Sequence, residues 1–147
     1  MPLSIFVRFN DEQSTDYGHI GDRVKYLPQN LFMPPRMTLD EAFRLYDVEY
    51  GGLVSFDPKF HTFQKKQFRE LSGGEARVAE MFIIIKSPSD FCILDEPFSN
   101  IAPIHVEKMQ SLIREEKANK GIIVSDHLYE AIIQVSDNLF LLRDGYT

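Results

Sequence analysis

The sequence predicts an α/β fold built on a parallel sheet, and the second half of the chain carries this prediction. Residues 91–94 and 121–124 are short apolar runs of the kind that form buried strands. Each run ends in polar residues and is followed by a stretch with helical periodicity. Strands that alternate with helices in this way form a parallel sheet covered by helices on both faces. Ligands of such sheets bind beyond the carboxyl ends of the strands.

The first half of the chain gives shorter signals. Residues 3–9 alternate loosely between apolar and polar side chains, which predicts a strand, and residues 10–22 are polar and turn-like. Residues 24–27 predict a short strand that stops at Pro28. Two adjacent prolines at 34 and 35 exclude regular structure there.

A first capping-box pattern, Thr38 with Glu41, predicts the start of a helix. We expect this helix to end near Gly51 and Gly52, because two glycines weaken a helix interior. Residues 56–70 predict a loop followed by a further helix.

A second capping-box pattern, Ser72 with Glu75, opens the predicted, largely buried helix 76–86. Gly73 and Gly74 leave backbone N–H groups open to a ligand that approaches closely. A phosphate is the natural ligand, because a helix N-terminus favours negative charge. For these residues alone an ordinary capped helix is the commoner explanation.

The remaining elements complete the alternation of strands and helices. They are expected in the order strand 91–94, helix 104–118, strand 121–124, helix 128–135 and strand 139–142, closed by a turn at Asp144 and Gly145. The chain shows no internal repeat and no low-complexity linker, so residues 1–147 are interpreted as a single domain.

Composition limits the classes of function. With 16 basic and 22 acidic residues the net charge is −6, which argues against a general nucleic-acid or anionic-membrane surface. The one cysteine, Cys92, excludes a disulfide within the chain and fits a reducing compartment. No apolar run reaches the roughly 18 residues that a membrane span needs. A membrane role is therefore expected to go through a partner.

Two adjacent carboxylates follow the predicted strand 91–94. Mg²⁺ prefers oxygen ligands and keeps several waters, so Asp95 at the strand tip can hold a hydrated ion. Glu96 can orient or deprotonate a water that attacks a γ-phosphate. Two adjacent acids alone are usually a solvated turn, but the preceding apolar run and the following Pro97 argue against that.

Two further polar residues follow predicted strands. Gln29 comes after strand 24–27, and its neutral amide can bind Mg²⁺ or a water without adding charge. His127 comes after strand 121–124. Each is a weak signal alone, because most glutamines are surface residues and a histidine at a strand end is usually just partly exposed.

Together these motifs resemble those of the ATP-binding cassette (ABC) ATPases. Residues 71–75, Leu-Ser-Gly-Gly-Glu, resemble the signature loop, and residues 91–97 resemble the Walker B strand with its adjoining glutamate. Residues 26–29 resemble the Q-loop, and His127 the switch histidine. The four motifs stand in family order, and the resemblance runs from about residue 4 to residue 145.

The resemblance implies a P-loop NTPase-like ABC ATPase fold: a parallel sheet flanked by helices, with a helical subdomain at about residues 36–86 inserted in the α/β core. It implies ATP and Mg²⁺ as cofactors. The implied site residues are Glu96 and His127 for catalysis, Ser72, Gly73, Gly74 and Gln29 for nucleotide binding, and Asp95 and Gln29 for the metal.

The resemblance also implies partners. These are a second ATPase subunit, in a homodimer or heterodimer, and a membrane permease subunit. No nucleic acid and no direct membrane insertion is expected. The implied location is cytoplasmic, peripheral to the inner membrane through the permease.

The sequence departs from the family pattern in two places. It contains no Gly-x-x-x-x-Gly-Lys-Ser/Thr, the Walker A loop, which we expect before Leu3. We therefore interpret the chain as an ABC ATPase domain without its N-terminal portion. Ala102 stands where the family has the aspartate of its D-loop, which puts communication across a dimer in doubt.

The missing loop matters for ATP affinity. Four charge-assisted hydrogen bonds at about 1.5–3 kcal/mol each come to about 6–12 kcal/mol. Millimolar to micromolar binding corresponds to only about 4–8 kcal/mol in total. We therefore expect the 147 residues alone to bind ATP weakly and to hydrolyse it slowly or not at all.

The missing loop matters for the sheet as well. In the family its strand lies between the strand before His127 and the last strand. Without it we expect that residues 3–9 are recruited, that a second copy fills the gap, or that the sheet closes up, because open edges invite pairing.

Three functions remain open. The favoured one is part of a transporter ATPase, with a soft resemblance at residues 96–98 and 125–127 to subunits of lipopolysaccharide export or branched-chain amino-acid uptake. The second is a non-catalytic partner that lends its signature loop to another subunit's ATP. The third is an ABC ATPase outside transport.

Overall fold

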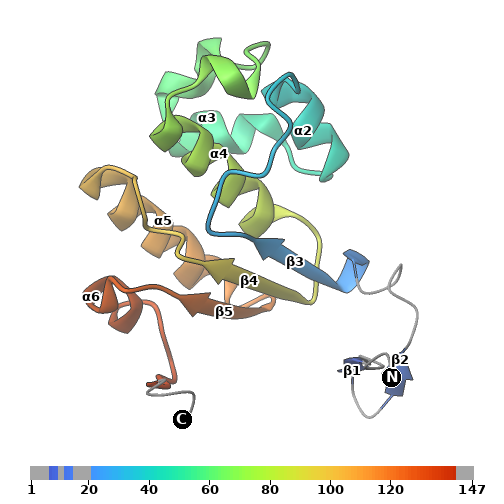
Figure 1. The fold of residues 1–147 in the computed structure, drawn as a ribbon, viewed down its shortest axis with the longest axis vertical. Coiled ribbons are helices and arrows are strands. Elements are labelled where there is room, and N and C mark those ends of the chain that lie inside the picture. The colour runs from blue at the N-terminus through green and yellow to red at the C-terminus, as the bar shows by residue number, and fades with distance from the viewer. Residues whose placement is uncertain (1–6, 10–11, 15–20, 142–147) are drawn as a thin grey trace, which may run out of the picture.

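A three-stranded parallel sheet is the centre of the computed structural model, which describes residues 7–9, 12–14 and 21–141 (Figure 1). Its strands are β3 (Val24–Leu27), β4 (Phe91–Asp95) and β5 (Gly121–Ser125), in the order β3-β4-β5. Tyr26 pairs with Ile93, and Asp95 pairs with Ser125. The carboxyl ends of all three strands therefore meet at one edge, as the predicted α/β fold requires.

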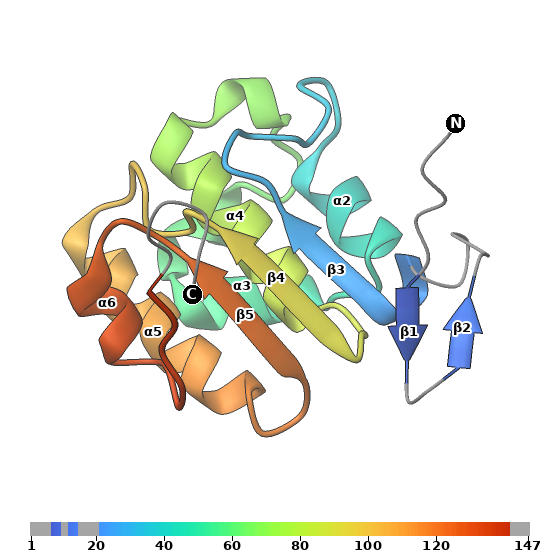
Figure 2. The same cartoon turned by 60° about the horizontal axis from the view of Figure 1, so that its bottom comes forward.

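The helices are grouped above and behind this sheet (Figures 1 and 2). They are α2 (Leu39–Leu45), α3 (Tyr50–Phe56), α4 (Gly73–Lys86), α5 (Pro103–Glu116) and α6 (Tyr129–Ile133), with two 3-10 turns, η1 (Pro58–Thr62) and η2 (Phe68–Glu70). The helices α2 and α3 lie away from the sheet, whereas α4 and α5 lie against it.

Helix α4 is the shared core of the molecule. All ten residues from 76 to 85 are buried, although a surface helix would expose one face. The helix contacts β3 and β4 on one side and α2 and α5 on others. The expectation of a largely buried helix after Ser72 is confirmed.

Only one face of the sheet is covered by the described helices. Leu27, Cys92 and Leu94 are buried toward α4 and α5. On the opposite face, Tyr26 is 50% exposed and Ile123 is 60% exposed. The expectation of helices on both faces is wrong for the described residues. Right-handed crossovers from β3 to β4 and from β4 to β5 step in the same direction, so their helices fall on the same side.

The predicted long helix from Thr38 to the glycine pair is wrong, because two helices stand there. Asp47 lies between α2 and α3 with φ 55, a left-handed conformation that ends the first helix. Gly52 lies in the first turn of α3, where a Cβ would come within 3.1 Å of the Phe82 ring. Close packing on α4, and not a helix stop, explains this glycine.

The segment before the signature loop also differs from expectation. It contains the 3-10 turns η1 and η2 instead of an α-helix. Helices α5 and α6 and strand β5 agree with their predicted ranges to within two residues.

The structure near the two ends of the chain also differs from the predicted strands and turns. Val7–Phe9 (β1) pairs antiparallel with Glu12–Ser14 (β2) on the β3 side of the sheet, so it is not recruited beside β5 (Figure 2). The strand β2 replaces part of the expected turn. Residues 139–141 form no strand, because no described neighbour pairs with them. Residues 3–6 and the turn at 144–145 lie outside the described residues.

Within the described ranges, no helix combines the length and the apolar composition that crossing a membrane demands.

Because the described helices cover only one face of the sheet, two isoleucine truncations should lower the free energy of unfolding by different amounts. Ile84→Ala, on buried α4, should lower the free energy of unfolding by about 2–5 kcal/mol, because it leaves a cavity. Ile123→Ala, on the open face, should cost about 1 kcal/mol or less. Urea denaturation measures both, and equal costs would show that this face of β5 is covered.

Candidate functional site

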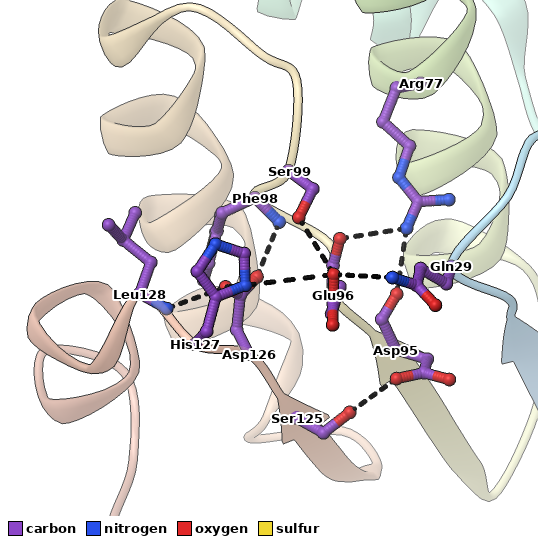
Figure 3. Close-up of polar contacts among 10 residues, drawn as sticks. All are labelled: Gln29, Arg77, Asp95, Glu96, Phe98, Ser99, Ser125, Asp126, His127 and Leu128. Atoms are coloured by element: carbon purple, nitrogen blue, oxygen red, sulfur yellow. Dashed lines mark hydrogen bonds and ion pairs between the residues drawn. The ribbon is translucent and has the colours of Figure 1, made fainter.

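Four predicted site residues gather at the carboxyl ends of the strands (Figure 3). Gln29 follows β3, Asp95 ends β4, Glu96 follows it, and His127 follows β5. Gln29 Nε2 donates to Glu96 Oε2 at 2.9 Å. His127 Nδ1 lies 3.8 Å from the same oxygen, which is an electrostatic contact rather than a hydrogen bond.

Glu96 is held in an unusual backbone conformation. Its φ of 46 lies in the left-handed region, which disfavours residues with a Cβ. Its N–H donates to the Ser125 carbonyl at 2.7 Å, and its side chain accepts from Ser99 Oγ at 3.3 Å. Such strain persists only where the surroundings hold it, and it is typical of functional sites.

The Asp95 carboxylate is bound by both neighbouring strands. Ser125 Oγ donates to Oδ1 at 2.8 Å, and Tyr26 OH donates to Oδ2 at 3.1 Å. The register places all three side chains on the open face of the sheet. The hydrogen bond to Asp95 raises the pKa of Tyr26.

The donor set fits a hydrated Mg²⁺ better than a metal held by many ligands. In the part of the chain that the structure describes, no three or more His, Cys, Asp or Glu side chains form a metal-binding group. Mg²⁺ is usually bound by one or two carboxylates together with waters and phosphates. Asp95 supplies one carboxylate, and the contact of Gln29 with Glu96 uses its NH₂ group and not its amide oxygen.

His127 is presented by a buried neighbour. The His127 side chain is 74% exposed, whereas the Asp126 side chain is 1% exposed. Asp126 accepts from Phe98 N at 3.0 Å and from Leu128 N at 2.8 Å, which fixes the turn after β5. Asp126 lies within residues 125–127, and the sequence pattern alone indicates no role for it.

The signature loop forms the predicted capping box. Ser72 Oγ accepts from Glu75 N at 3.2 Å, and Glu75 Oε2 accepts from Ser72 N at 2.8 Å. A Cβ on Gly74 would lie 3.2 Å from the Asn100 carbonyl, so a contact within the chain already explains this glycine. A Cβ on Gly73 would meet nothing within 4 Å.

Arg77 joins the signature helix to the strand ends, and the sequence analysis missed it. The side chain is almost fully buried. Its Nη1 donates to the Pro28 carbonyl at 2.6 Å, and its Nη2 donates to the carbonyls of Asp95 and Glu96 at 2.9 and 3.1 Å (Figure 3). One guanidinium thus binds two of the three segments that carry the strand-end residues, those after β3 and β4.

Glu80, one turn later on α4, holds the rest of the loop after β3. Its Oε1 accepts from the backbone N–H groups of Phe32 and Met33, each at 2.9 Å. Burial lowers the pKa of Arg77 and raises that of Glu80. Two charged residues within the otherwise apolar run 76–85 were the signal that could have revealed both roles, because such groups are rarely buried without partners.

Comparison with known proteins gives relatives but no matching family model. The chain is 34% identical over 86 residues to the lipopolysaccharide export system ATP-binding protein LptB of Acidithiobacillus ferridurans, covering 58% of this chain and 36% of that protein. It is 30% identical over 130 residues to ABC transporter I family member 17 of Arabidopsis thaliana, covering 87% and 46%. It is 26% identical over 138 residues to the uncharacterized ABC transporter ATP-binding protein YhaQ of Bacillus subtilis, covering 86% and 46%.

Solved structures confirm the predicted fold. The ATP-binding subunit of an ABC transporter matches with a TM-score of 0.70 at 19% identity, covering 87% of this chain and 58% of that one. A dimeric ATP-binding cassette bound to ADP and phosphate in a post-hydrolysis state matches with a TM-score of 0.67 at 15% identity, covering 86% and 64%. The chain thus spans between 36% and 46% of the length of these three curated relatives.

Arg77 should be among the most sensitive positions of the chain. Arg77→Met removes the hydrogen bonds to the carbonyls of Pro28, Asp95 and Glu96. It also leaves the buried Glu80 carboxylate without the cation that lies 3.9 Å from it, so the unfolding free energy should fall by about 3–5 kcal/mol. Arg77→Lys should cost less, because it keeps the charge but not the planar fork. Chemical denaturation against the exposed control Arg69→Met tests this; equal losses at both positions would contradict it.

The two signature glycines should respond oppositely to alanine. Gly73→Ala has free space and should raise the unfolding free energy by about 0.4–1 kcal/mol through the unfolded state. Gly74→Ala must displace the Asn100 carbonyl and should lower it. Thermal unfolding gives the sign for each variant, and a stabilising Gly74→Ala would refute the contact.

Proposed function

We propose that this chain, which is homologous over most of its length to the ATP-binding domains of ABC transporters, is the nucleotide-binding part of such a transporter. In the complete protein it would couple ATP binding and hydrolysis to transport. The grouping of Gln29, Asp95, Glu96 and His127 at the strand ends is the observation that supports this proposal most strongly.

The proposed roles follow from the chemistry of these side chains. Asp95 and Gln29 would hold Mg²⁺, which neutralises charge on the phosphates when bound. Glu96 would act as the general base for the attacking water. Its hydrogen bond from Gln29 would place this base next to a ligand of the metal. His127 is exposed and close to Glu96, so it is placed to donate to a phosphate oxygen.

The signature loop is proposed to serve a second nucleotide. Gly73 is a glycine that nothing in the described chain requires, which fits a close approach from outside. Ser72 and Gly74 lie beside it at the N-terminus of α4, where a phosphate is favoured. A dimer of ATPase subunits would bring such a phosphate, and the dimeric cassette among the similar structures supports that arrangement.

The permease partner is proposed to bind at α2 and α3. A hollow of about 340 Å³ there is lined by Phe43, Arg44, Asp47, Val48 and Glu49. Leu45 beside it is 67% exposed, which fits an apolar contact with another protein. Through this partner the chain would lie at the cytoplasmic side of the inner membrane.

One observation favours a second candidate function. The 147 residues contain no Gly-x-x-x-x-Gly-Lys-Ser/Thr, so on their own they would bind ATP only weakly. A non-catalytic subunit that donates only Ser72, Gly73 and Gly74 to a partner's nucleotide would need no such loop. An ABC ATPase outside transport is a third candidate, and capture of a permease from membranes would exclude it.

Two substitutions in the ATPase assembly that contains this chain separate the first two candidates. If the chain is catalytic, Glu96→Gln should lower the turnover number by about 10²–10⁴-fold through loss of the general base. Ser72→Arg should lower it in either case, because it blocks the phosphate at the signature loop. Phosphate release at saturating MgATP measures both effects.

The matched control is Ser111→Arg, on the outer side of α5, which should leave turnover unchanged. Loss of activity with Ser72→Arg but not with Glu96→Gln would favour the non-catalytic partner. Normal activity with both would refute the residue assignments. The chain alone should release phosphate at less than about 0.1 per second, below the usual enzyme range.

A further inference from the structure

The turn between α3 and η1 lies between two parts of the candidate site. Asp57 is both the C-cap of α3 and the N-cap of η1, where its Oδ1 accepts from Lys59 N at 3.1 Å. The charged groups of this turn contact α5 on one side and the start of α4 on the other.

Two contacts join the turn to the first part of α5. Asp57 Oδ2 lies 2.8 Å from His105 Nε2, and both side chains are largely buried. Lys108 donates to the Phe56 carbonyl at 2.9 Å, and its ammonium lies 5.6 Å from the centre of the Phe56 ring. Burial raises the pKa of Asp57, but hydrogen bonds from His105 and Lys59 N outweigh it and hold that pKa below its ordinary value.

One ion pair joins the same turn to the signature loop. The Lys59 ammonium binds Glu75 Oε1, whereas Glu75 Oε2 closes the capping box on Ser72 N. The hydrogen bond from Lys59 lowers the pKa of Glu75. Glu75 therefore uses one oxygen for the cap and the other for the turn.

The two links enclose the contact between two loops. Helix α5 follows directly on residues 99–102, and the Asn100 carbonyl of that loop faces Gly74. The turn holds α5 through Asp57 and the signature cap through Lys59. The distance between Gly74 and the Asn100 carbonyl is thus fixed by these two links as well as by their own contact.

We propose that Asp57 and Lys59 are positioning residues that hold the signature loop against residues 99–102. Neither residue belongs to a motif that the sequence analysis recognised. The inference rests on the proposed function, because it assigns both residues to the loop that would face a phosphate.

The test is amide NMR spectroscopy of the 147-residue chain without nucleotide. Lys59→Met should shift the signals of Gly73, Gly74 and Asn100. It should also speed hydrogen exchange in the first turn of α4 by about two- to fivefold, the effect of a partly exposed ion pair. Lys59→Arg should restore both. The matched control Lys65→Met removes an exposed lysine that pairs with Asp40 and should change neither.

Two further variants make the test specific. Asp57→Asn should shift the Gly74 signal through α5, although residue 57 does not touch Glu75. In a Glu75→Gln background, Lys59→Met should have no further effect, because no charge is left to pair. If Asp57→Asn does not fold, the Lys59 variants decide the matter.

Shifts confined to residues 58–60 and 75 would overturn the proposal, and so would additive effects of Lys59→Met and Glu75→Gln. Because no ATP is added, this outcome is independent of the ATPase tests. A chain that fails those tests can still show the coupling, and an active ATPase can lack it.

Discussion

A single buried guanidinium holds the candidate site together. Arg77 binds the carbonyls of Pro28, Asp95 and Glu96, which belong to two segments far apart in the chain. Burial makes a cation costly unless it is hydrogen-bonded, and both terminal nitrogens of Arg77 are bonded to these carbonyls, although its Nε has no partner. Moving the carbonyls away would therefore leave more of the buried cation without partners. Arg77 therefore fixes three segments relative to one another. They are the loop that carries Gln29, the end of β4 and the signature helix α4. Burial of α4 on every side makes this arrangement part of the hydrophobic core.

The sheet supplies a second constraint, which acts on side chains. Pairing of Asp95 with Ser125 brings their oxygens within hydrogen-bond distance, and the register of β3 brings Tyr26 from the other side. The carboxylate is oriented by both neighbouring strands before any ligand arrives. The strained backbone of Glu96 is held in the same way, by Ser125 and Arg77. A preoriented acid pair of this kind suits phosphate chemistry, where positioning contributes most.

The two signature glycines show how one motif can combine two physical causes. Gly74 is required by the carbonyl of Asn100, which is part of the same chain. Gly73 faces open space, and no contact within the described chain requires a glycine there, which fits the proposed approach of a phosphate from outside. The surrounding charges of Asp57, Lys59 and Glu75 then hold the loop in place. The motif is therefore in part a folding requirement, and under the proposed function Gly73 would be its binding part.

The sequence by itself determined the strands 24–27, 91–94 and 121–124, the last two of which extend one residue further in the structure. It also determined the capped helix at Ser72 and the polar residues after each strand. These features depend on local periodicity and capping, which neighbours in sequence decide. It also grouped Gln29, Asp95, Glu96 and His127 correctly, because parallel strands end at one edge. The break at Asp47 was missed, since its left-handed backbone reflects the packing of α2 and α3 on α4.

Only the tertiary structure decided the roles of Arg77, Glu80 and Asp126. Their long-range partners lie between 18 and 49 positions away in the sequence, and no local pattern records such distances. The same holds for the uncovered face of the sheet, which depends on the direction in which successive crossovers step. Local chemistry thus pointed to the candidate site residues, whereas long-range hydrogen bonds and packing decided which residues hold them in place.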